Sequence, residues 1–198
     1  MSRAQQSAAP PAGLVHVPDL LTPEQHDDAV AGLERLEMHE LRMRGQLARR
    51  TVRHFGWDYG YDSWTLVPAE PLPGFLEPLR AAAAAVAGLD QAALEQALVT
   101  SYPPGATIGW HRDAPMFGTV AGISLLAACR MRFQRGTGPD REVYEIALEP
   151  RSGYVLAGEA RTRWQHSIPA VKEPRWSVTF RTLRNPGRWR RELPAGGV

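Results

Sequence analysis

A histidine and a carboxylate stand two residues apart in the stretch GWHRDAPMFG, as His111 and Asp113. If this stretch is a β-strand, both side chains point to one face, because successive residues of a strand alternate between faces. A further histidine, His166, lies in a later strand-like segment, WQHSIP. Two histidines and one carboxylate on a shared face are typical of non-haem Fe(II) oxygenases, which leave metal positions open for a cosubstrate and O₂. The three residues are therefore candidate iron ligands.

Two arginines of the segment RWSVTFRTL, Arg175 and Arg181, are separated by an even number of residues. On one strand, both would therefore face the same side. A guanidinium that faces the interior needs an anionic partner, because a buried unpaired charge is costly. A dicarboxylic cosubstrate could supply that anion through paired charge-assisted hydrogen bonds. On this segment alone, an exposed strand with two solvated arginines remains the alternative, and the histidine–aspartate pattern favours the interior arrangement.

The elements that must position these residues indicate an α+β fold. Pro23 at a first helical position predicts a helix over 23–36, an alanine-rich run before Gly88 predicts a second, and Asp90 caps a third and shorter one, DQAALEQALV. From about Leu98 onward, short strand-like runs alternate with Pro and Gly turns. This order predicts a sandwich, a jelly roll or a small barrel with the helices packed outside.

The composition fits one globular domain of 198 residues. Residues 1–13 are predicted to be a disordered tail, and no stretch is apolar enough for a signal peptide or a membrane span. The single cysteine, Cys129, excludes an internal disulfide and is predicted to be a buried inert thiol, which fits a cytoplasmic protein. Arginines cluster between 42 and 53, a pattern that suits phosphate contact or, alternatively, a solvated surface.

Tyr102, nine positions before His111, together with the HxD motif, His166 and the R-x₅-R spacing, resembles the AlkB family of Fe(II)- and 2-oxoglutarate-dependent dioxygenases. The resemblance covers roughly residues 50–183. It implies a double-stranded β-helix (a jelly roll), with Fe(II), 2-oxoglutarate and O₂ as cofactor and cosubstrates. It also implies one domain over 14–198, with a nucleotide-recognition lid at about 42–67 and a catalytic core at about 98–184.

The resemblance assigns a role to each motif residue. Iron binding falls to His111, Asp113 and His166. Arg175 would pair with the distal carboxylate of 2-oxoglutarate, Tyr102 would hydrogen-bond the cosubstrate, and Arg181 would lie near its iron end. Better-known members often carry Asn at two positions that are here occupied by Thr100 and Ser177, which can also form hydrogen bonds.

The stretch RRTVRHFGWDYGY resembles the nucleotide-recognition lid of the same family. An unstacked base needs aromatic faces and nearby cations. The candidate substrate contacts are Arg50 for phosphate and Trp57, Tyr59 and Tyr61 for a base or phosphate. The implied partner is alkylated DNA or RNA, single-stranded or with a flipped base, and the implied protein is a monomer that releases succinate, CO₂ and an aldehyde.

The sequence departs from several DNA-repair members directly after Asp113. Those members carry acidic residues there, whereas this chain has Ala114, Pro115 and Met116. A carboxylate at this place would favour a cationic methylated base, so its absence leaves the preferred substrate open. Two alternatives stand beside repair of alkylated nucleic acid: the same chemistry on tRNA or a protein side chain, and a nucleic-acid-binding module without catalysis.

Overall fold

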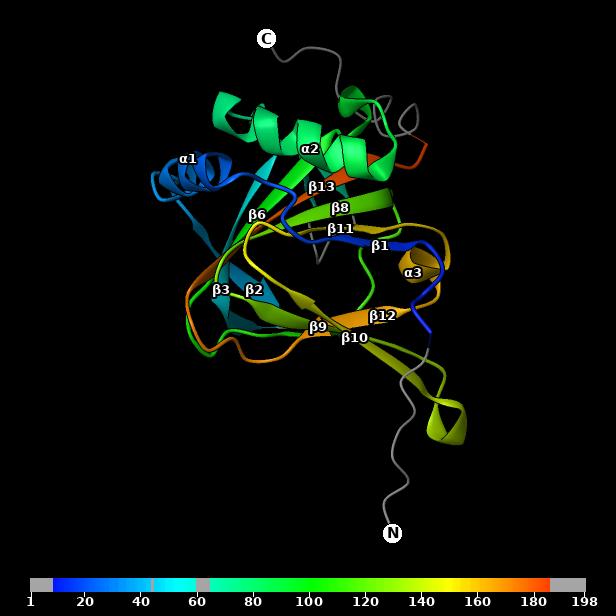
Figure 1. The fold of residues 1–198 in the computed structure, drawn as a ribbon. Helices are drawn as coiled ribbons and strands as arrows, with labels where there is room; N and C mark the ends of the chain where they lie inside the picture. Colours follow the sequence, from blue (N-terminus) through cyan, green and yellow to red (C-terminus); the bar gives the residue numbers. More distant parts are fainter. Residues whose placement is uncertain (1–8, 44, 60–64, 186–198) are drawn as a thin grey trace.

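The computed structural model describes residues 9–43, 45–59 and 65–185, and it consists of two facing antiparallel sheets with helices outside the larger one (Figure 1). The larger sheet has seven strands in the order β1-β11-β8-β13-β6-β3-β2, and the smaller has four in the order β10-β9-β12-β7. This arrangement confirms the predicted double-stranded β-helix of the α+β class.

The bounds of the elements are as follows. In the larger sheet they are β1 Leu14–Val17, β2 His39–Met43, β3 Gln46–Phe55, β6 Gln96–Tyr102, β8 Phe117–Leu126, β11 Gly153–Leu156 and β13 Arg175–Leu183. In the smaller sheet they are β7 Ile108–His111, β9 Cys129–Arg135, β10 Glu142–Leu148 and β12 Gln165–Ile168. A separate pair consists of β4 Trp57–Tyr59 and β5 Leu66–Pro68. The α-helices are α1 Pro23–Leu33, α2 Glu77–Ala87 and α3 Gly158–Thr162, and the 3₁₀ turns are η1 Gly74–Leu76, η2 Gln91–Ala93 and η3 Gly138–Asp140.

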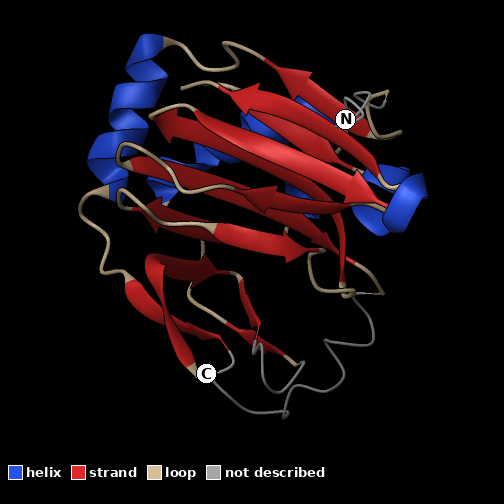
Figure 2. Cartoon of the chain, turned by 90° about the horizontal axis from the view of Figure 1, so that it is seen from below, coloured by secondary structure: helices blue, strands red, loops and turns tan. Residues whose placement is uncertain are grey.

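Helices α1 and α2 cover the outer face of the larger sheet, and in the perpendicular view they lie behind and beside its strands (Figure 2). Leu33 of α1 and Leu79 of α2 pack in one buried cluster with Ile123 and Val178 from the central strands. Helix α1 begins as predicted, with Pro23 in its first turn, but it ends earlier than the predicted Leu36. The chain turns there because the next backbone N–H groups bond to carbonyls three residues back, which tightens the last turn.

The predicted third helix, DQAALEQALV, is wrong. Only a single 3₁₀ turn, η2, follows Asp90, and β6 begins at Gln96. Strand β6 pairs with β3 on one side and β13 on the other, so its backbone groups are satisfied within the sheet. It is also buried on both faces, and such strands read as continuous apolar runs without the alternation that identifies a half-buried strand.

The space between the two sheets holds a second buried cluster, to which Tyr102 and Val120 contribute from the larger sheet and Met131 and Phe133 from the smaller. Cys129 is buried beside them, as predicted, and burial raises the pKa of its thiol. Within the described part of the chain, no helix has the length and apolar character that a membrane span requires.

The segment predicted as a lid, 42–67, divides into two parts. Strand β3 extends the larger sheet through its pairing with β6, whereas β4 and β5 form the separate two-stranded pair. The β4–β5 pair packs in a third cluster with Met116, Phe117 and Leu183. Residues 60–64, between the two strands of this pair, lie outside the described residues.

Candidate metal and cosubstrate site

A cavity of about 1040 Å³ lies between the two sheets. Its walls come from β3, β6 and β13 of the larger sheet, from β7 and β12 of the smaller, and from the loop that follows β7. His111, Asp113 and His166 all line it. The pairing of distant strands has therefore brought the three candidate ligands to one place.

The two histidines face each other across neighbouring strands. His111 on β7 is the register partner of His166 on β12, and their ring centroids are 4.2 Å apart. Asp113 lies beyond the end of β7, so the expectation that it shares a strand with His111 is wrong. One potential ligand atom from each of the three residues lies within 4.8 Å of the others.

The charge states of these side chains suit a divalent metal. Burial alone would raise the pKa of Asp113, but Arg181, His166, His111 and Arg161 outweigh that effect and hold the pKa well below its usual range. Burial and the neighbouring His111 lower the pKa of His166 to about 3, although Asp113 opposes the shift. At neutral pH the site thus offers a carboxylate and a neutral imidazole, the forms that bind metals.

Hydrogen bonds leave the right atoms open for a metal. His111 Nδ1 donates to the carbonyl oxygen of Gly109 at 2.9 Å, so its Nε2 keeps a lone pair. Asp113 Oδ1 accepts from Arg181, whereas the buried Oδ2 has no hydrogen-bond partner among the described residues. A buried carboxylate oxygen without a partner is costly unless a cation occupies the position beside it.

Arg175 carries a second set of unpaired buried atoms. Its side chain is 1% exposed, its Nη2 donates to Ser124 Oγ at 3.0 Å, and its guanidinium lies 4.8 Å from the ring centroid of Tyr102. Nε and Nη1 have no partner among the described residues. Arg175 does not itself line the cavity, but Tyr102 does. The unpaired donors of this guanidinium can form charge-assisted hydrogen bonds with a carboxylate.

The other predicted cosubstrate residues lie on the side of the cavity formed by the larger sheet. Arg181 is held by Gln96 Oε1 at 2.9 Å and by Asp113 Oδ1 at 3.1 Å, so it directly contacts a candidate metal ligand. Thr100 and Ser177 are register partners on β6 and β13, and both line the cavity. The even spacing of Arg175 and Arg181 does place both side chains in the interior, as the sequence predicts.

Comparison with known families decides the class of this site. Residues 13–189 match the family described as the 2OG-Fe(II) oxygenase superfamily. The chain belongs to this superfamily. Within it, the relatives described next place the chain in the AlkB family of 2-oxoglutarate- and Fe(II)-dependent dioxygenases, which use O₂ as the oxidant.

Two similar sequences support the assignment to the AlkB family, and one solved structure shares the fold. A Xenopus tropicalis protein named tRNA (carboxymethyluridine(34)-5-O)-methyltransferase alkbh8 is 30% identical over 169 residues, which are 82% of this chain and 26% of that protein. An Arabidopsis thaliana protein named alkylated DNA repair protein ALKBH8 homolog is 27% identical over 209 residues, 87% of this chain and 59% of that protein. The solved structure of OsALKBH1 has a TM-score of 0.67 and 14% identity, and covers 89% of this chain and 99% of its own. The chain thus spans only about a quarter of the Xenopus relative.

The predicted substrate residues of this AlkB-family oxygenase divide between cavity and core. Arg50 and Tyr59 line the cavity, and Arg50 Nη1 donates to the carbonyl oxygen of Thr107 at 3.1 Å. Trp57 is buried in the third cluster and does not line the cavity. Tyr61 lies outside the described residues.

His54 is a cavity residue that the sequence reasoning missed. Burial lowers its pKa to about 4, so the imidazole is neutral at physiological pH, and it lies 3.3 Å from Gln96 Nε2. Alternation along β3 could have revealed it, because Arg50, Val52 and His54 share one face of that strand, the face that lines the cavity.

Arg161 is a second missed residue, and it holds the loop after Asp113 in place. Its guanidinium donates to the carbonyl oxygens of Ala114, Phe117 and Gly118 at 2.6, 2.9 and 3.1 Å. Arg161 is 5% exposed and also helps to hold Asp113 ionised. Nothing in the sequence around the short helix α3 signals this contact, because the two segments meet only in the folded chain.

We expect Arg161→Met to weaken both the fold and metal binding. The substitution removes three hydrogen bonds from a charged donor and leaves buried carbonyls unpaired, which should cost about 2–4 kcal/mol of unfolding free energy. Denaturant unfolding and titration with Mn²⁺ measure the two effects. Arg163→Met is the matched control, because the Arg163 side chain is 68% exposed and pairs with Glu159 at the surface. Equal stability of both variants would contradict the role given to Arg161.

Proposed function

We propose that this AlkB-family oxygenase removes alkyl groups oxidatively from nucleobases of DNA or RNA. Two buried sites beside one cavity carry the proposal. They are Asp113 Oδ2, in the same group as His111 and His166, and the Nε and Nη1 of Arg175, none of which has a hydrogen-bond partner among the described residues. The first fits Fe(II), and the second fits the distal carboxylate of 2-oxoglutarate.

In this proposal His111, Asp113 and His166 hold the metal, and bound Fe(II) with 2-oxoglutarate and O₂ supplies the oxidation of an N-alkyl carbon. The alkyl group leaves as an aldehyde, and the cosubstrate becomes succinate and CO₂. Arg175 fixes the position of the cosubstrate. Burial raises the pKa of Tyr102, which keeps its phenol protonated as a hydrogen-bond donor.

The residues around the metal site orient and protect the reacting groups. Arg181 keeps the carboxylate of Asp113 ionised and fixed, because it contacts that carboxylate directly. Thr100 and Ser177 supply further hydrogen-bonding groups to the cosubstrate wall, and Arg50 and Tyr59 supply a cation and an aromatic ring where a base would enter.

A panel of substrates tests the function. Purified protein with Fe(II) and 2-oxoglutarate is incubated with oligonucleotides that carry N1-methyladenine, N3-methylcytosine or N3-methylthymine, with tRNA, and with a methylated peptide. Formation of formaldehyde and of the unmodified base on an oligonucleotide is the expected result. Oxidation of tRNA alone would favour tRNA as the substrate, the alternative that the name of the Xenopus relative supports. Turnover of the peptide alone would overturn the proposal.

The charge around the cavity bears on which base is preferred. Among the described lining residues, Asp113 is the sole carboxylate, and it is committed to the metal. Several arginines line the same cavity, among them Arg112, Arg161 and Arg181. A positive environment disfavours a cationic base such as N1-methyladenine relative to the uncharged N3-methylthymine.

We therefore expect Pro115→Asp to shift the preference toward the cationic base. Pro115 is exposed and lines the cavity, so a carboxylate there would face an entering base without disturbing the core. The ratio of turnover on N1-methyladenine to turnover on N3-methylthymine should rise about tenfold, because a partly screened ion pair would stabilise only the cationic base. Pro115→Asn is the matched control, because it makes the same change of shape without charge. A rise of the same size in that variant would rule out the electrostatic explanation.

A further inference from the structure

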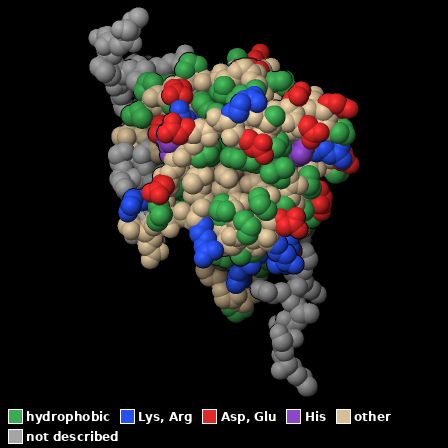
Figure 3. Space-filling model, turned by 90° about the vertical axis from the view of Figure 1, so that its left-hand side faces the viewer, with side chains coloured by type: hydrophobic (Ala, Val, Ile, Leu, Met, Phe, Trp, Pro, Cys, Tyr) green, Lys and Arg blue, Asp and Glu red, His purple; other side chains and the backbone are tan. Residues whose placement is uncertain are grey.

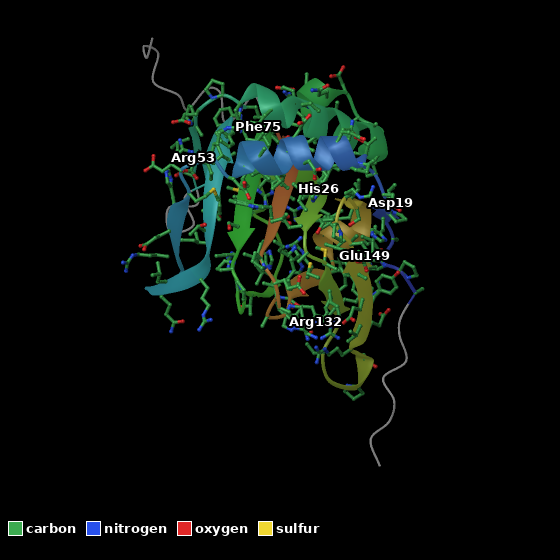
Figure 4. The ribbon with its side chains drawn as sticks, turned by 60° about the vertical axis from the view of Figure 1, so that its left-hand side comes forward. Asp19, His26, Arg53, Phe75, Arg132 and Glu149 are labelled. Atoms are coloured by element: carbon green, nitrogen blue, oxygen red, sulfur yellow. The ribbon has the colours of Figure 1, made fainter. Side chains whose placement is uncertain are left out.

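The outer face of the smaller sheet is rich in arginine. Along β9, Met131 and Phe133 point into the core between the sheets, so Arg130 and Arg132 point outward. Arg132 lies at the lower end of the molecule in Figure 4, and side chains of Lys and Arg gather at the lower end of the surface in Figure 3. This face is opposite to the one covered by α1 and α2 (Figure 1).

Two arginines lie over Trp110 on the edge strand β7, and a third arginine follows it in the chain. The guanidinium carbon of Arg132 lies 5.1 Å from the Trp110 ring centroid, and that of Arg141 lies 5.9 Å from it. Arg132 reaches this position across Ser167 of β12, its register partner. Arg112 follows two residues after Trp110 and donates to the carbonyl oxygen of Arg163. We call Trp110, Arg112, Arg132 and Arg141 the Trp110 cluster.

The Trp110 cluster differs from the other arginines of the same sheet in its lack of counter-charges. Arg135 forms ion pairs with Glu142 and Glu159, and Arg130 forms one with Glu145. In the described part of the chain, Arg112, Arg132 and Arg141 form no ion pair with a carboxylate. The buried Nε of Arg132 also has no hydrogen-bond partner there. Guanidinium groups that are fixed by an aromatic ring but lack a carboxylate are set up to receive an external anion.

The Trp110 cluster is continuous with the cavity, because Trp110 and Arg112 also line it. We propose that the cluster binds the phosphates of a single nucleic-acid strand whose neighbouring base is inserted into the cavity. The proposal rests on the proposed function and adds the path of the strand: from the cavity, past Arg112, and over the outer face of the smaller sheet. Three guanidinium groups along that path match the regular negative charge of a phosphate backbone.

A binding experiment separates this path from the chemistry in the cavity. Fluorescence anisotropy is measured with a labelled single-stranded DNA of about 15 nucleotides and its RNA counterpart, each at several salt concentrations. The double variant Arg132→Gln/Arg141→Gln should bind about tenfold more weakly than the wild type. Its slope of log affinity against log salt should fall by about 1.4, since each phosphate contact on a single strand contributes about 0.7.

Two further variants test whether the loss of affinity is specific to the Trp110 cluster. Arg141→Gln alone changes an exposed residue, so it should fold normally and show about half of the loss in salt slope. Arg35→Gln is the matched control, because Arg35 is exposed at the end of α1, away from this face, and should bind like the wild type. Turnover of an alkylated nucleoside should be unchanged in every variant, because it carries no phosphate for the Trp110 cluster to bind.

The possible outcomes distinguish a failure of the proposed strand path from a failure of the proposed function. Unchanged affinity and salt slope in the double variant, with normal binding by the wild type, would overturn the path and leave the proposed function standing. If the wild type binds no oligonucleotide and dealkylates none, both fall together. An equal loss in Arg35→Gln would show that total charge, and not the Trp110 cluster, sets the affinity, and would also overturn the path.

Discussion

Asp113→Ala is expected to abolish the conversion of 2-oxoglutarate to succinate. The substitution removes the sole anionic ligand from the group formed by His111, Asp113 and His166. Loss of residues that merely orient a metal ligand typically costs 10–100-fold in metal affinity, so loss of the ligand itself should cost more than about 100-fold. Calorimetric titration with Fe(II) under anaerobic conditions and an assay of succinate measure the two effects.

The control for this variant must keep the buried Arg181 satisfied. Asp113 Oδ1 accepts from Arg181 Nη2, so alanine would leave that guanidinium with Gln96 as its remaining hydrogen-bond partner among the described residues. Asp113→Asn preserves an acceptor oxygen and removes the charge. It should melt close to the wild type and still lose most of its affinity for Fe(II). Full succinate formation by a folded Asp113→Asn protein would disprove the ligand assignment.

The parts of the site that the sequence predicted are those governed by strand periodicity. Arg175 and Arg181 share one buried face of β13, as an even separation requires, and Thr100 faces Ser177 across the β6–β13 pair. His166 meets His111 because β12 pairs with β7. Its position in a later strand-like segment made His166 a candidate, and the family resemblance supported it, since spacing along the chain cannot say which distant strands become neighbours.

The parts that sequence reasoning missed depend on contacts made only in three dimensions. Arg161 reaches the loop after Asp113 from a helix of five residues, and no local pattern links the two segments. Trp57 was predicted to contact the substrate. It is instead buried among the apolar residues of the third cluster, which includes β4 and β5. The beginning of strand β6 was predicted to be helical. It is a strand because its central position in the larger sheet overrides local propensity.

Arg175→Met should raise the concentration of 2-oxoglutarate needed for half-maximal turnover by about 100-fold or more. The guanidinium would donate two charge-assisted hydrogen bonds to one carboxylate, each worth about 1.5–3 kcal/mol, and about 1.4 kcal/mol corresponds to a factor of ten. Turnover at saturating cosubstrate should fall much less, because Arg175 contacts the carboxylate that lies away from the metal. Steady-state assays across a range of 2-oxoglutarate concentrations separate the two quantities.

The same variant gives a second readout that is independent of turnover. Without cosubstrate, the buried Nε and Nη1 of Arg175 have no partner among the described residues, so methionine at this position should leave the free protein as stable as the wild type or more stable. The wild type should gain thermal stability when 2-oxoglutarate binds, and the variant should lose most of that gain. Arg175→Lys should recover part of it, because an ammonium keeps the charge but not the fork of donors. A full gain in Arg175→Met would place the carboxylate elsewhere. A variant that is more stable alone and indifferent to 2-oxoglutarate would mean that Arg175 is kept for binding at a cost to the fold.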